Sequence, residues 1–454
     1  MSHVLLARAL FGITLGYHIG YATITVGTPL LILLAEILAV RTGQPFYRIF
    51  AKRITLVLML LVGVGLVTGT TVAVMLSVLW PGFMKTVGEV INLPFQIEVF
   101  AFMLESLFLA IYVYGGKRLS TRARIMSAAF IAIGSGLSAL LITDVNAFMN
   151  TPTGFQWVNG HVEHANPWKA MLSPAMPTEL SHVLVSAYMT VGFIYAAVSA
   201  KGLLRRNATS FEREYYRRSL NLSLWVAGIM SILTAVIGDA SGKFLERYQP
   251  EKLAAAEGLF KTTTHAPLVI GGVADPQTGS VAGGISVPGL LSFLATGKFN
   301  GTVTGLNAFP KSTWPPLFVH LLFDVMVGIG SLGIVIALVY AFYRIRRKSA
   351  DSPRWLLSLV FTMGILSMMG IEDGWVFAEI ARQPWMIYGV LTVADSVTAT
   401  ANIGLMFIGF LSLYTVLLAG TIWALRTYFR HHPLTDEDEL EIPAPVDRKR
   451  GITA

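Results

Sequence analysis

The chain has 454 residues, of which 54% are hydrophobic and only 13% are charged, and its mean hydropathy is +0.63. Soluble domains carry roughly 25% charged residues, so this composition excludes a disordered chain, a coiled coil and almost any water-soluble enzyme. The formal net charge of +8 does not require a nucleic-acid partner, because cytoplasmic loops of membrane proteins collect Lys and Arg. Cysteine is absent, which excludes disulfides, thiolate metal sites and covalent haem attachment.

Nine apolar segments are long enough to cross a bilayer, which takes about 20 residues. They cover residues 8–39, 54–80, 95–115, 124–148, 178–203, 218–240, 316–344, 355–380 and 399–427. The first ten residues lack a basic region followed by a small-residue cleavage site, so we expect the first segment to stay in the membrane. The sequence therefore predicts an all-α, polytopic membrane bundle of nine transmembrane helices.

Basic residues alternate along the connections between these segments. The connections after the first, third, fifth and seventh segments carry clusters of Lys and Arg, and the intervening connections are poor in both. The clusters begin at Arg41, Lys117, Lys201 and Arg344, and the last includes Lys348. The positive-inside rule then places the N-terminus outside and the C-terminus in the cytoplasm.

The predicted spans divide the chain into four parts. Helices 1–6 occupy residues 1–240, a long external loop occupies 241–315, helices 7–9 occupy 316–430, and a cytoplasmic tail occupies 431–454. The external loop is rich in Gly, Pro, Thr and Ser, with one helix-like stretch at 250–260. A loop of this length is usually functional or disordered. We interpret the acidic run at 436–439 in the tail as a solvated segment.

Ionisable residues inside the spans are functional candidates, because a charge in the bilayer core is costly. They are His18, His182 and His320, with the carboxylates Glu36, Glu98, Glu105, Asp144, Asp239, Asp324, Glu372, Asp373 and Glu379. Imidazole paired with thioether ligates haem iron, and Met326 falls at the same outer depth as several of these residues. The set is compatible with a haem enzyme and with a proton-coupled transporter.

Glu98 and Glu105 are seven residues apart, so two helical turns place them on one face about 10 Å apart. Such a pair suits a proton relay, or a ligand beside a relay. The alternative is that each carboxylate pairs with a neighbouring helix.

One motif decides between these classes. The sequence Glu379-Ile-Ala-Arg382-Gln383-Pro384-Trp385 resembles the Glu-x-x-Arg-Gln-Pro-Trp signature of subunit I of cytochrome bd-type quinol oxidases. Further segments are similar to that family in order, and together they extend the resemblance over nearly the whole chain. They are 16–18, 98–106, 134–138, 146–149, 181–182, 238–242, 252–257 and 324–328.

The resemblance implies haem cofactors and their ligands. His182 and Met326 would be the axial ligands of a low-spin haem b, and Glu379 would ligate a high-spin haem b. His18, with Glu98 nearby, would serve haem d or a third haem b. Trp375 and Arg382 would surround the haem pair, and a cation close to Glu379 would favour the ionised ligand.

The resemblance also assigns proton and donor residues. Glu105 and Ser106 would belong to a proton path from the cytoplasm, with Ser138 as a possible partner. Lys252 and Glu257 would bind or deprotonate quinol, although a Lys and a Glu on an external helix are often simply exposed.

Three positions depart from the family's pattern. The family usually spaces its two carboxylates one residue further apart than Glu98 and Glu105, a rotation of about 100° that a helical bulge could absorb. Asp324 stands where an arginine is common, and His320 four residues earlier could pair with it. Lys243 replaces a tyrosine of the quinol loop. These changes bear on the donor site and on haem potentials more than on the fold.

The function that the resemblance implies is a terminal oxidase subunit in a bacterial or archaeal cytoplasmic (inner) membrane. It would oxidise membrane quinol at the outer face and reduce O2 to water with cytoplasmic protons, which generates a proton motive force without pumping. Expected partners are a second, related membrane subunit and sometimes a small single-helix subunit, but no nucleic acid. One alternative is a bd-like oxidoreductase with another donor or acceptor. The other is a cofactor-free transporter, although the inverted repeats and broken helices common in transporters are missing from the sequence.

Overall fold

The computed structural model describes residues 3–347, 352–398 and 402–434. Within these ranges nine helices are long and apolar enough to cross a membrane. They are α1 (His3–Thr42), α2 (Pro45–Leu79), α3 (Pro81–Gly115), α4 (Thr121–Asn150), α6 (Met176–Leu204), α7 (Ser210–Tyr248), α10 (Val319–Arg347), α11 (Arg354–Ile380) and α13 (Ile403–His431). The predicted all-α bundle and its nine spans are therefore confirmed.

Three helices extend well beyond the predicted spans. Helix α2 begins at Pro45 rather than 54, α3 begins at Pro81 rather than 95, and α7 continues to Tyr248. Proline suits a first helical turn because its missing N–H would have no helical partner there. Hydropathy detects only the most apolar part of a helix, so the predicted spans did not include these extensions. The external loop predicted from residue 241 accordingly begins as helix.

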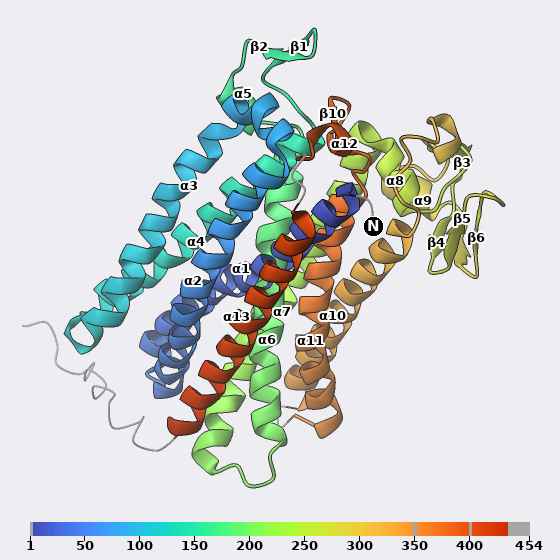
Figure 1. Cartoon of the computed structure of the whole chain (residues 1–454). Helices are drawn as coiled ribbons and strands as arrows, with labels where there is room; N and C mark the ends of the chain where they lie inside the picture. The colour runs from blue at the N-terminus through green and yellow to red at the C-terminus, as the bar shows by residue number, and fades with distance from the viewer. Residues whose placement is uncertain (1–2, 348–351, 399–401, 435–454) are drawn as a thin grey trace, which may run out of the picture.

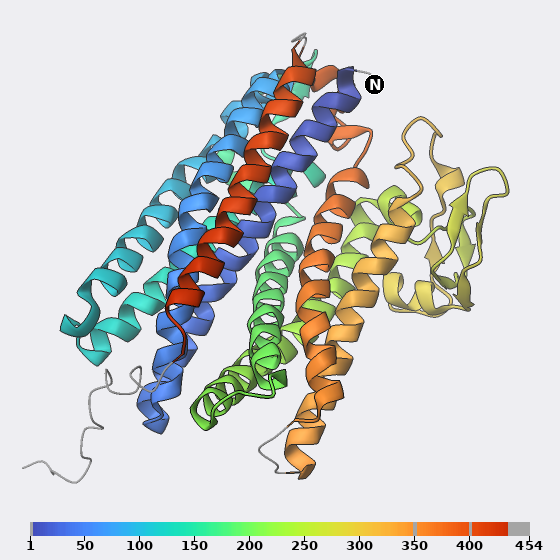
Figure 2. The ribbon, with the colours of Figure 1, turned by 60° about the horizontal axis from the view of Figure 1, so that its bottom comes forward.

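The long helices form one bundle in which α1 runs through the middle (Figures 1 and 2). Helix α1 packs on α2, α4, α6 and α13, while α6, α7, α10 and α11 pack on one another. Glycine allows the closest approach of α1 to α6, since a Cβ at Gly27 would lie 2.4 Å from the Val191 side chain. Small residues at helix contacts are typical of membrane bundles.

The connections after α1, α3 and α6 lie at one end of the bundle, together with the end of α10 and the start of α11, and this is the lower end in Figure 1. The predicted Lys and Arg clusters belong to this end. Below, this end is called the basic end and the opposite one the loop end. A 3₁₀ turn, η1 (Gly116–Arg118), lies between α3 and α4 at the basic end.

The loop end carries the longest connection, between α7 and α10. It contains α8 (Pro250–Ala256), α9 (Leu290–Thr296) and the 3₁₀ turn η2 (Leu306–Ala308). Three antiparallel pairs complete it: β3 (Thr263–Thr264) with β8 (Thr302–Val303), β4 (Leu268–Ile270) with β7 (Ile285–Val287), and β5 (Val273–Asp275) with β6 (Ser280–Ala282). The helix predicted at 250–260 is confirmed as far as residue 256.

Two smaller connections complete the loop end. The α4–α6 connection holds β1 (Gln156–Val158), β2 (His161–Glu163) and α5 (Pro167–Met171). After α11 follow β9 (Trp385–Ile387), β10 (Leu391–Thr392) and α12 (Val393–Ser396). The predicted acidic run at 436–439, Lys348 and the first residues of the ninth predicted span, 399–401, lie outside the described residues.

Candidate functional site

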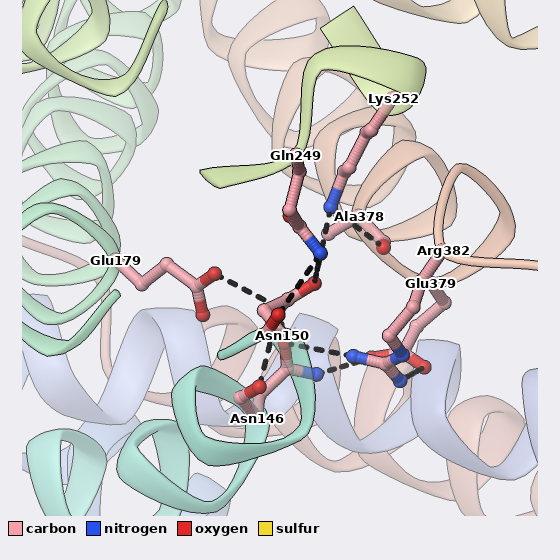
Figure 3. A network of polar contacts seen from close by, with 8 residues as sticks. All are labelled: Asn146, Asn150, Glu179, Gln249, Lys252, Ala378, Glu379 and Arg382. Carbon is pink, nitrogen blue, oxygen red and sulfur yellow. Dashed lines mark hydrogen bonds and ion pairs between the residues drawn. The ribbon is translucent and has the colours of Figure 1, made fainter. Parts of the chain in front are cut away.

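A buried polar network joins three elements at the loop end: the end of α4, the start of α8 and the end of α11 (Figure 3). The Lys252 ammonium donates to Asn150 Oδ1 at 3.4 Å and to the Ala378 carbonyl at 3.3 Å. The side-chain amide of Gln249 donates to the Asn150 carbonyl at 3.1 Å. Lys252 is only 6% exposed, so it attaches the long loop to the bundle instead of facing solvent.

The same network contains the signature residues of α11. Arg382 Nη2 donates to Glu379 Oε2 at 2.8 Å, and Asn146 Nδ2 donates to Glu379 Oε1. The predicted pairing of Arg382 with Glu379 is therefore confirmed. Arg382 is buried, and its charge-assisted hydrogen bond, with the one from Asn146, fixes the position of the Glu379 carboxylate.

Three members of the network were missed by sequence reasoning: Asn150, Glu179 and Gln249. Asn150 Nδ2 donates to Glu179 Oε1 at 2.8 Å and to Asn146 Oδ1 at 3.0 Å. Because Asn146 and Asn150 lie four residues apart, they share one face of α4. Two asparagines at this spacing in an apolar segment were the available signal. The pair links Lys252 on the loop to Glu379 on α11.

Glu257 lies on the other side of α8, next to α10. It is 6% exposed, so the reading of Lys252 and Glu257 as an exposed pair is wrong. Nearby, His320 Nδ1 contacts the Ala256 carbonyl at 2.8 Å, and the Gly271 N–H donates to Asp324 Oδ2 at 2.6 Å. His320 Nε2 lies 3.5 Å from Asp324 Oδ2, which confirms their predicted pairing.

Burial shifts the titration of both loop residues. It raises the pKa of Glu257 to about 8, and the negative charge of Asp324 adds to this shift. It lowers the pKa of Lys252 to about 8, although the carboxylates of Glu179 and Glu379 partly oppose that shift. Removing water disfavours the charged form of either group. Near neutral pH both residues can therefore exchange protons.

His182 and Met326, the predicted low-spin ligands, lie near the loop ends of α6 and α10. His182 Nδ1 is buried and has no hydrogen-bond partner within the described ranges. A Cβ at Gly238 would lie 3.7 Å from His182 Cε1, and one at Gly374 would lie 3.0 Å from Met326 Sδ. A buried imidazole nitrogen without a partner is costly, and a metal ligated by the ring would remove that cost. These residues fit a haem ligated between α6 and α10.

His18 on α1 has one ring nitrogen occupied. Its Nδ1 lies 3.1 Å from Thr68 Oγ1, and that hydroxyl is within donating distance of the Val64 and Gly65 carbonyls. Thr68 therefore accepts from His18, which leaves the lone pair of Nε2 for a metal. Such a partner is what a ligating histidine usually has. Thr68 was not predicted from the sequence.

Helix α11 carries two further residues beside the predicted ligands. Trp375 is partly buried, one turn before Glu379. Glu372 reaches across to α1, where a Cβ at Gly16 or at Gly20 would lie 3.4 Å from one of its carboxylate oxygens. The Glu372 carboxylate therefore lies beside the helical turns that flank His18. The sequence analysis did not predict this position for Glu372.

The carboxylates of α3 differ in their partners. Ser138 Oγ donates to Glu98 Oε1 at 2.6 Å, so the hydroxyl named as a possible partner in the proton path binds Glu98 in this structure. Helices α3 and α4 run antiparallel, and Gly134 of α4 lies against Glu105 of α3. Ser138, one turn after Gly134, therefore lies beside an earlier part of α3, where Glu98 is. Glu105 is buried, and its Oε1 has no partner in the described part of the chain.

Helix α3 is α-helical throughout Pro81–Gly115, with one internal proline, Pro94, ahead of Glu98. A bulge that could absorb the short spacing of the two carboxylates is therefore not present in this helix. Glu98 and Glu105 share a face, as predicted, and Ser106 follows Glu105 in a half-buried position. Within the described residues, no group of three or more His, Cys, Asp or Glu side chains forms a metal-ion site.

A cavity of about 440 Å³ lies between the start of α1 and the signature loop. Arg8, Thr313, Gln383 and Trp385 are among the residues that line it. Thr313 also donates to Glu251 at 2.6 Å, which connects the cavity wall to α8. Arg8 was not singled out from the sequence.

A family model for subunit I of the cytochrome bd terminal oxidase matches residues 6–433. The chain belongs to this family. The bd oxidase structure from Geobacillus thermodenitrificans superposes with a TM-score of 0.89 at 42% sequence identity, covering 95% of this chain and 99% of that one. The resemblance carried by the signature motif is thereby confirmed.

Two Bacillus subtilis (strain 168) proteins are similar over almost their whole lengths. One, provisionally named cytochrome bd menaquinol oxidase subunit I, is 47% identical over 96% of this chain and 99% of its own. The other, named cytochrome bd ubiquinol oxidase subunit 1, is 28% identical over 94% and 91%. As a member of the bd oxidase family, the chain combines the signature of α11 with a buried Lys and Glu on its long loop.

Proposed function

We propose that this chain is the quinol-oxidising, oxygen-reducing subunit of a bd-type terminal oxidase. The observation that carries the proposal is the buried network of Figure 3, which joins the loop residue Lys252 through Asn150 and Asn146 to Glu379 and Arg382. A donor site on the loop is thus held rigidly against the segment that would hold a haem. Family membership supports the same reading.

Four of the residues described above would ligate haem iron. His182 and Met326 would ligate low-spin haem b, Glu379 a high-spin haem b, and His18 a haem d or a third haem b, with Glu98 nearby. Bound haem supplies one-electron transfer and oxygen activation. Arg382 would hold the Glu379 carboxylate in place through their ion pair, and Trp375 would lie beside the haem pair.

We place the basic end in the cytoplasm by the positive-inside rule, with the N-terminus outside. The protein would be multi-pass in the bacterial cytoplasmic membrane, with a second membrane subunit and a small single-helix subunit as partners. Quinol would then be oxidised at the outer face and protons for water taken up from the cytoplasm. Charge separates across the membrane in this scheme without a pump.

At the donor site the chain's own residues would manage protons. Oxidation of one quinol releases two electrons and two protons. The Glu257 carboxylate would accept one of those protons as an electron leaves, and the second proton would pass to water at the outer face. Lys252 would donate a hydrogen bond to a quinol oxygen in place of its bond to Asn150 Oδ1. Asn150 Oδ1 would then still accept the hydrogen bond from Gln249.

A reduced-minus-oxidised spectrum of the purified protein, with quinol-driven oxygen uptake, tests this function. We expect haem bands and uptake that stops when quinol is omitted. A bd-like spectrum without quinol-driven uptake would favour the reading in which another donor or acceptor is used. A colourless protein would favour the cofactor-free transporter.

Replacing Glu257 by Gln should lower quinol turnover while all haems remain. The amide keeps the shape of the carboxyl but cannot accept a proton, and loss of such a base costs roughly a hundredfold or more in rate. Asp275→Asn, which removes a carboxylate from β5 of the same loop, serves as the control. Wild-type turnover in Glu257→Gln would argue against quinol oxidation at this site.

Quinol oxidation should follow a bell-shaped pH profile with its maximum near pH 8. The ionised fraction of Glu257 rises with pH through its pKa of about 8, whereas the charged fraction of Lys252 falls through its pKa of about 8. The rate at limiting quinol reports both groups in the free enzyme. Glu257→Gln should remove the rising limb and Lys252→Met the falling limb; unchanged limbs would exclude these assignments.

A further inference from the structure

A second buried carboxylate lies at the basic end, far from the loop network. Glu36, in the last turns of α1, is 1% exposed. The Tyr112 hydroxyl on α3 donates to its Oε1 at 2.6 Å, and its Oε2 has no hydrogen-bond partner among the described residues. The proposed function gives Glu36 no role, although an ionisable group in this position is costly to keep.

The titratable and charged groups that act on Glu36 come from α2, α3 and α4. Arg48 on α2 approaches with its Nε 3.9 Å from Glu36 Oε2, and Arg124 on α4 acts on the same carboxyl through its charge. The Arg48 side chain is 22% exposed, so it reaches from the buried carboxyl to solvent. A polar separation above 3.5 Å is one that a water can bridge. A water between Oε2 and Arg48 would therefore connect the buried carboxyl to solvent at the basic end.

Tyr112 extends this contact toward the middle of the bundle. Glu98, Glu105 and Tyr112 follow one another at intervals of seven residues on helix α3. Each interval is a rise of about 10 Å with little rotation, so the three side chains form a row on one face. Tyr112 belongs to a cluster of buried apolar residues from α1, α2, α3, α4, α6 and α7, so its hydroxyl is a polar group within an apolar region.

We propose that Glu36 and Tyr112 form the cytoplasmic uptake end of the proton path that leads to Glu105, a proposal that rests on the oxidase function. A proton arriving past Arg48 neutralises Glu36. The carboxyl then donates to the Tyr112 oxygen while the Tyr112 hydroxyl gives its own proton to a water on the side of Glu105. Each group ends as it began, so no charge accumulates. About three waters would bridge the 10 Å to Glu105 at ordinary hydrogen-bond spacing.

The alternative is that Glu36, Arg48 and Tyr112 only hold the helix ends together. Glu36→Gln separates the two roles, because glutamine still accepts the Tyr112 hydrogen bond but cannot carry a proton. Glu36→Asp retains the carboxyl and should restore function if the role is proton transfer. Tyr112→Phe removes the hydroxyl that continues the path. Glu214→Gln is the matched control, since Glu214 is a carboxylate of the basic end that pairs with Arg217 and Arg218 on α7.

The experiment measures quinol-driven oxygen uptake against pH in membranes, the solvent deuterium isotope effect, and the haem spectrum of each variant. We expect Glu36→Gln and Tyr112→Phe to lower turnover by about tenfold or more, with a larger loss at alkaline pH and a larger isotope effect. The haem bands should be unchanged, Glu36→Asp should recover most of the rate, and Glu214→Gln should match wild type. In infrared difference spectra, Glu36→Gln should lose the carboxyl band that responds to turnover, whereas Glu36→Asp should keep such a band.

Wild-type rates and pH profiles in both Glu36→Gln and Tyr112→Phe would overturn the proposal. Equal loss in Glu36→Gln and Glu36→Asp, accompanied by loss of haem, would assign the cluster a structural role and overturn it as well. If Glu36→Gln does not accumulate, Tyr112→Phe alone decides. A wild-type protein without quinol-driven uptake would instead refute the oxidase function on which the proposal rests.

Discussion

His182→Ala and Met326→Leu are each expected to remove the low-spin haem b spectrum while the protein remains in the membrane. Low-spin iron needs both axial positions filled, and the loss of one ligand leaves it five-coordinate and poorly suited to electron transfer. The unpartnered Nδ1 of His182 and the close approach of Gly238 to His182 and of Gly374 to Met326 support this pair as ligands. A reduced-minus-oxidised difference spectrum of purified protein measures the effect.

A matched control separates ligation from packing. Met369 on α11 is 55% exposed, so Met369→Leu makes the same chemical change outside the bundle interior and should leave every haem band intact. Quinol-driven oxygen uptake should fall to background in both His182→Ala and Met326→Leu. Unchanged low-spin bands in both of them would show that this haem is held by other residues.

The bundle followed from the sequence because lipid leaves few alternatives: a segment that crosses it must satisfy its backbone internally, so an apolar run of sufficient length becomes a helix. The helix ends did not follow in the same way. Residues 81–94 and 241–248 are helical outside the strongest apolar runs, where neither composition nor turn chemistry marks a boundary. Pro81 was readable as a loop residue and as a helical first turn, and the structure selects the latter.

The candidate site was predictable where residues lie close in sequence. Arg382 follows Glu379 by three residues, just past the end of α11, so their pairing needed no tertiary information. Asn150 could not be found in this way, because its partners Gln249 and Lys252 lie 99 and 102 residues away. A neutral amide also gives no electrostatic signal. The hydrogen-bond partner of Ser138 could not be predicted either, because it depends on how far α3 and α4 are shifted along each other. The packing at Gly134 sets that shift.

Glu105→Gln is expected to slow oxygen consumption severely, by on the order of a hundredfold, while the haems still reduce with dithionite. Oxygen reduction consumes protons at a buried site, and hydrocarbon supplies none. Glu105 is buried with Oε1 unpartnered in the described chain, so it is free to take up and release a proton. Glutamine keeps the shape and hydrogen-bonding capacity of the side chain but cannot release a proton, so only the relay should fail. Oxygen uptake in intact membranes measures the effect.

Two further substitutions on α3 test whether the effect is specific to Glu105. Glu89→Gln removes a carboxylate nearer the loop end of α3 and should respire normally. Glu98→Gln should instead change the spectrum or the ligand binding of the oxygen-reducing haem, because Glu98 bonds Ser138 and is expected to lie near His18. The alternative role for Glu105, a hydrogen-bond acceptor between α3 and α4, predicts little change on substitution by Gln, since the amide oxygen accepts the same bonds. Normal respiration in Glu105→Gln would therefore show that protons reach the haem by another route, and the row from Glu36 through Tyr112 would then have no acceptor at its inner end.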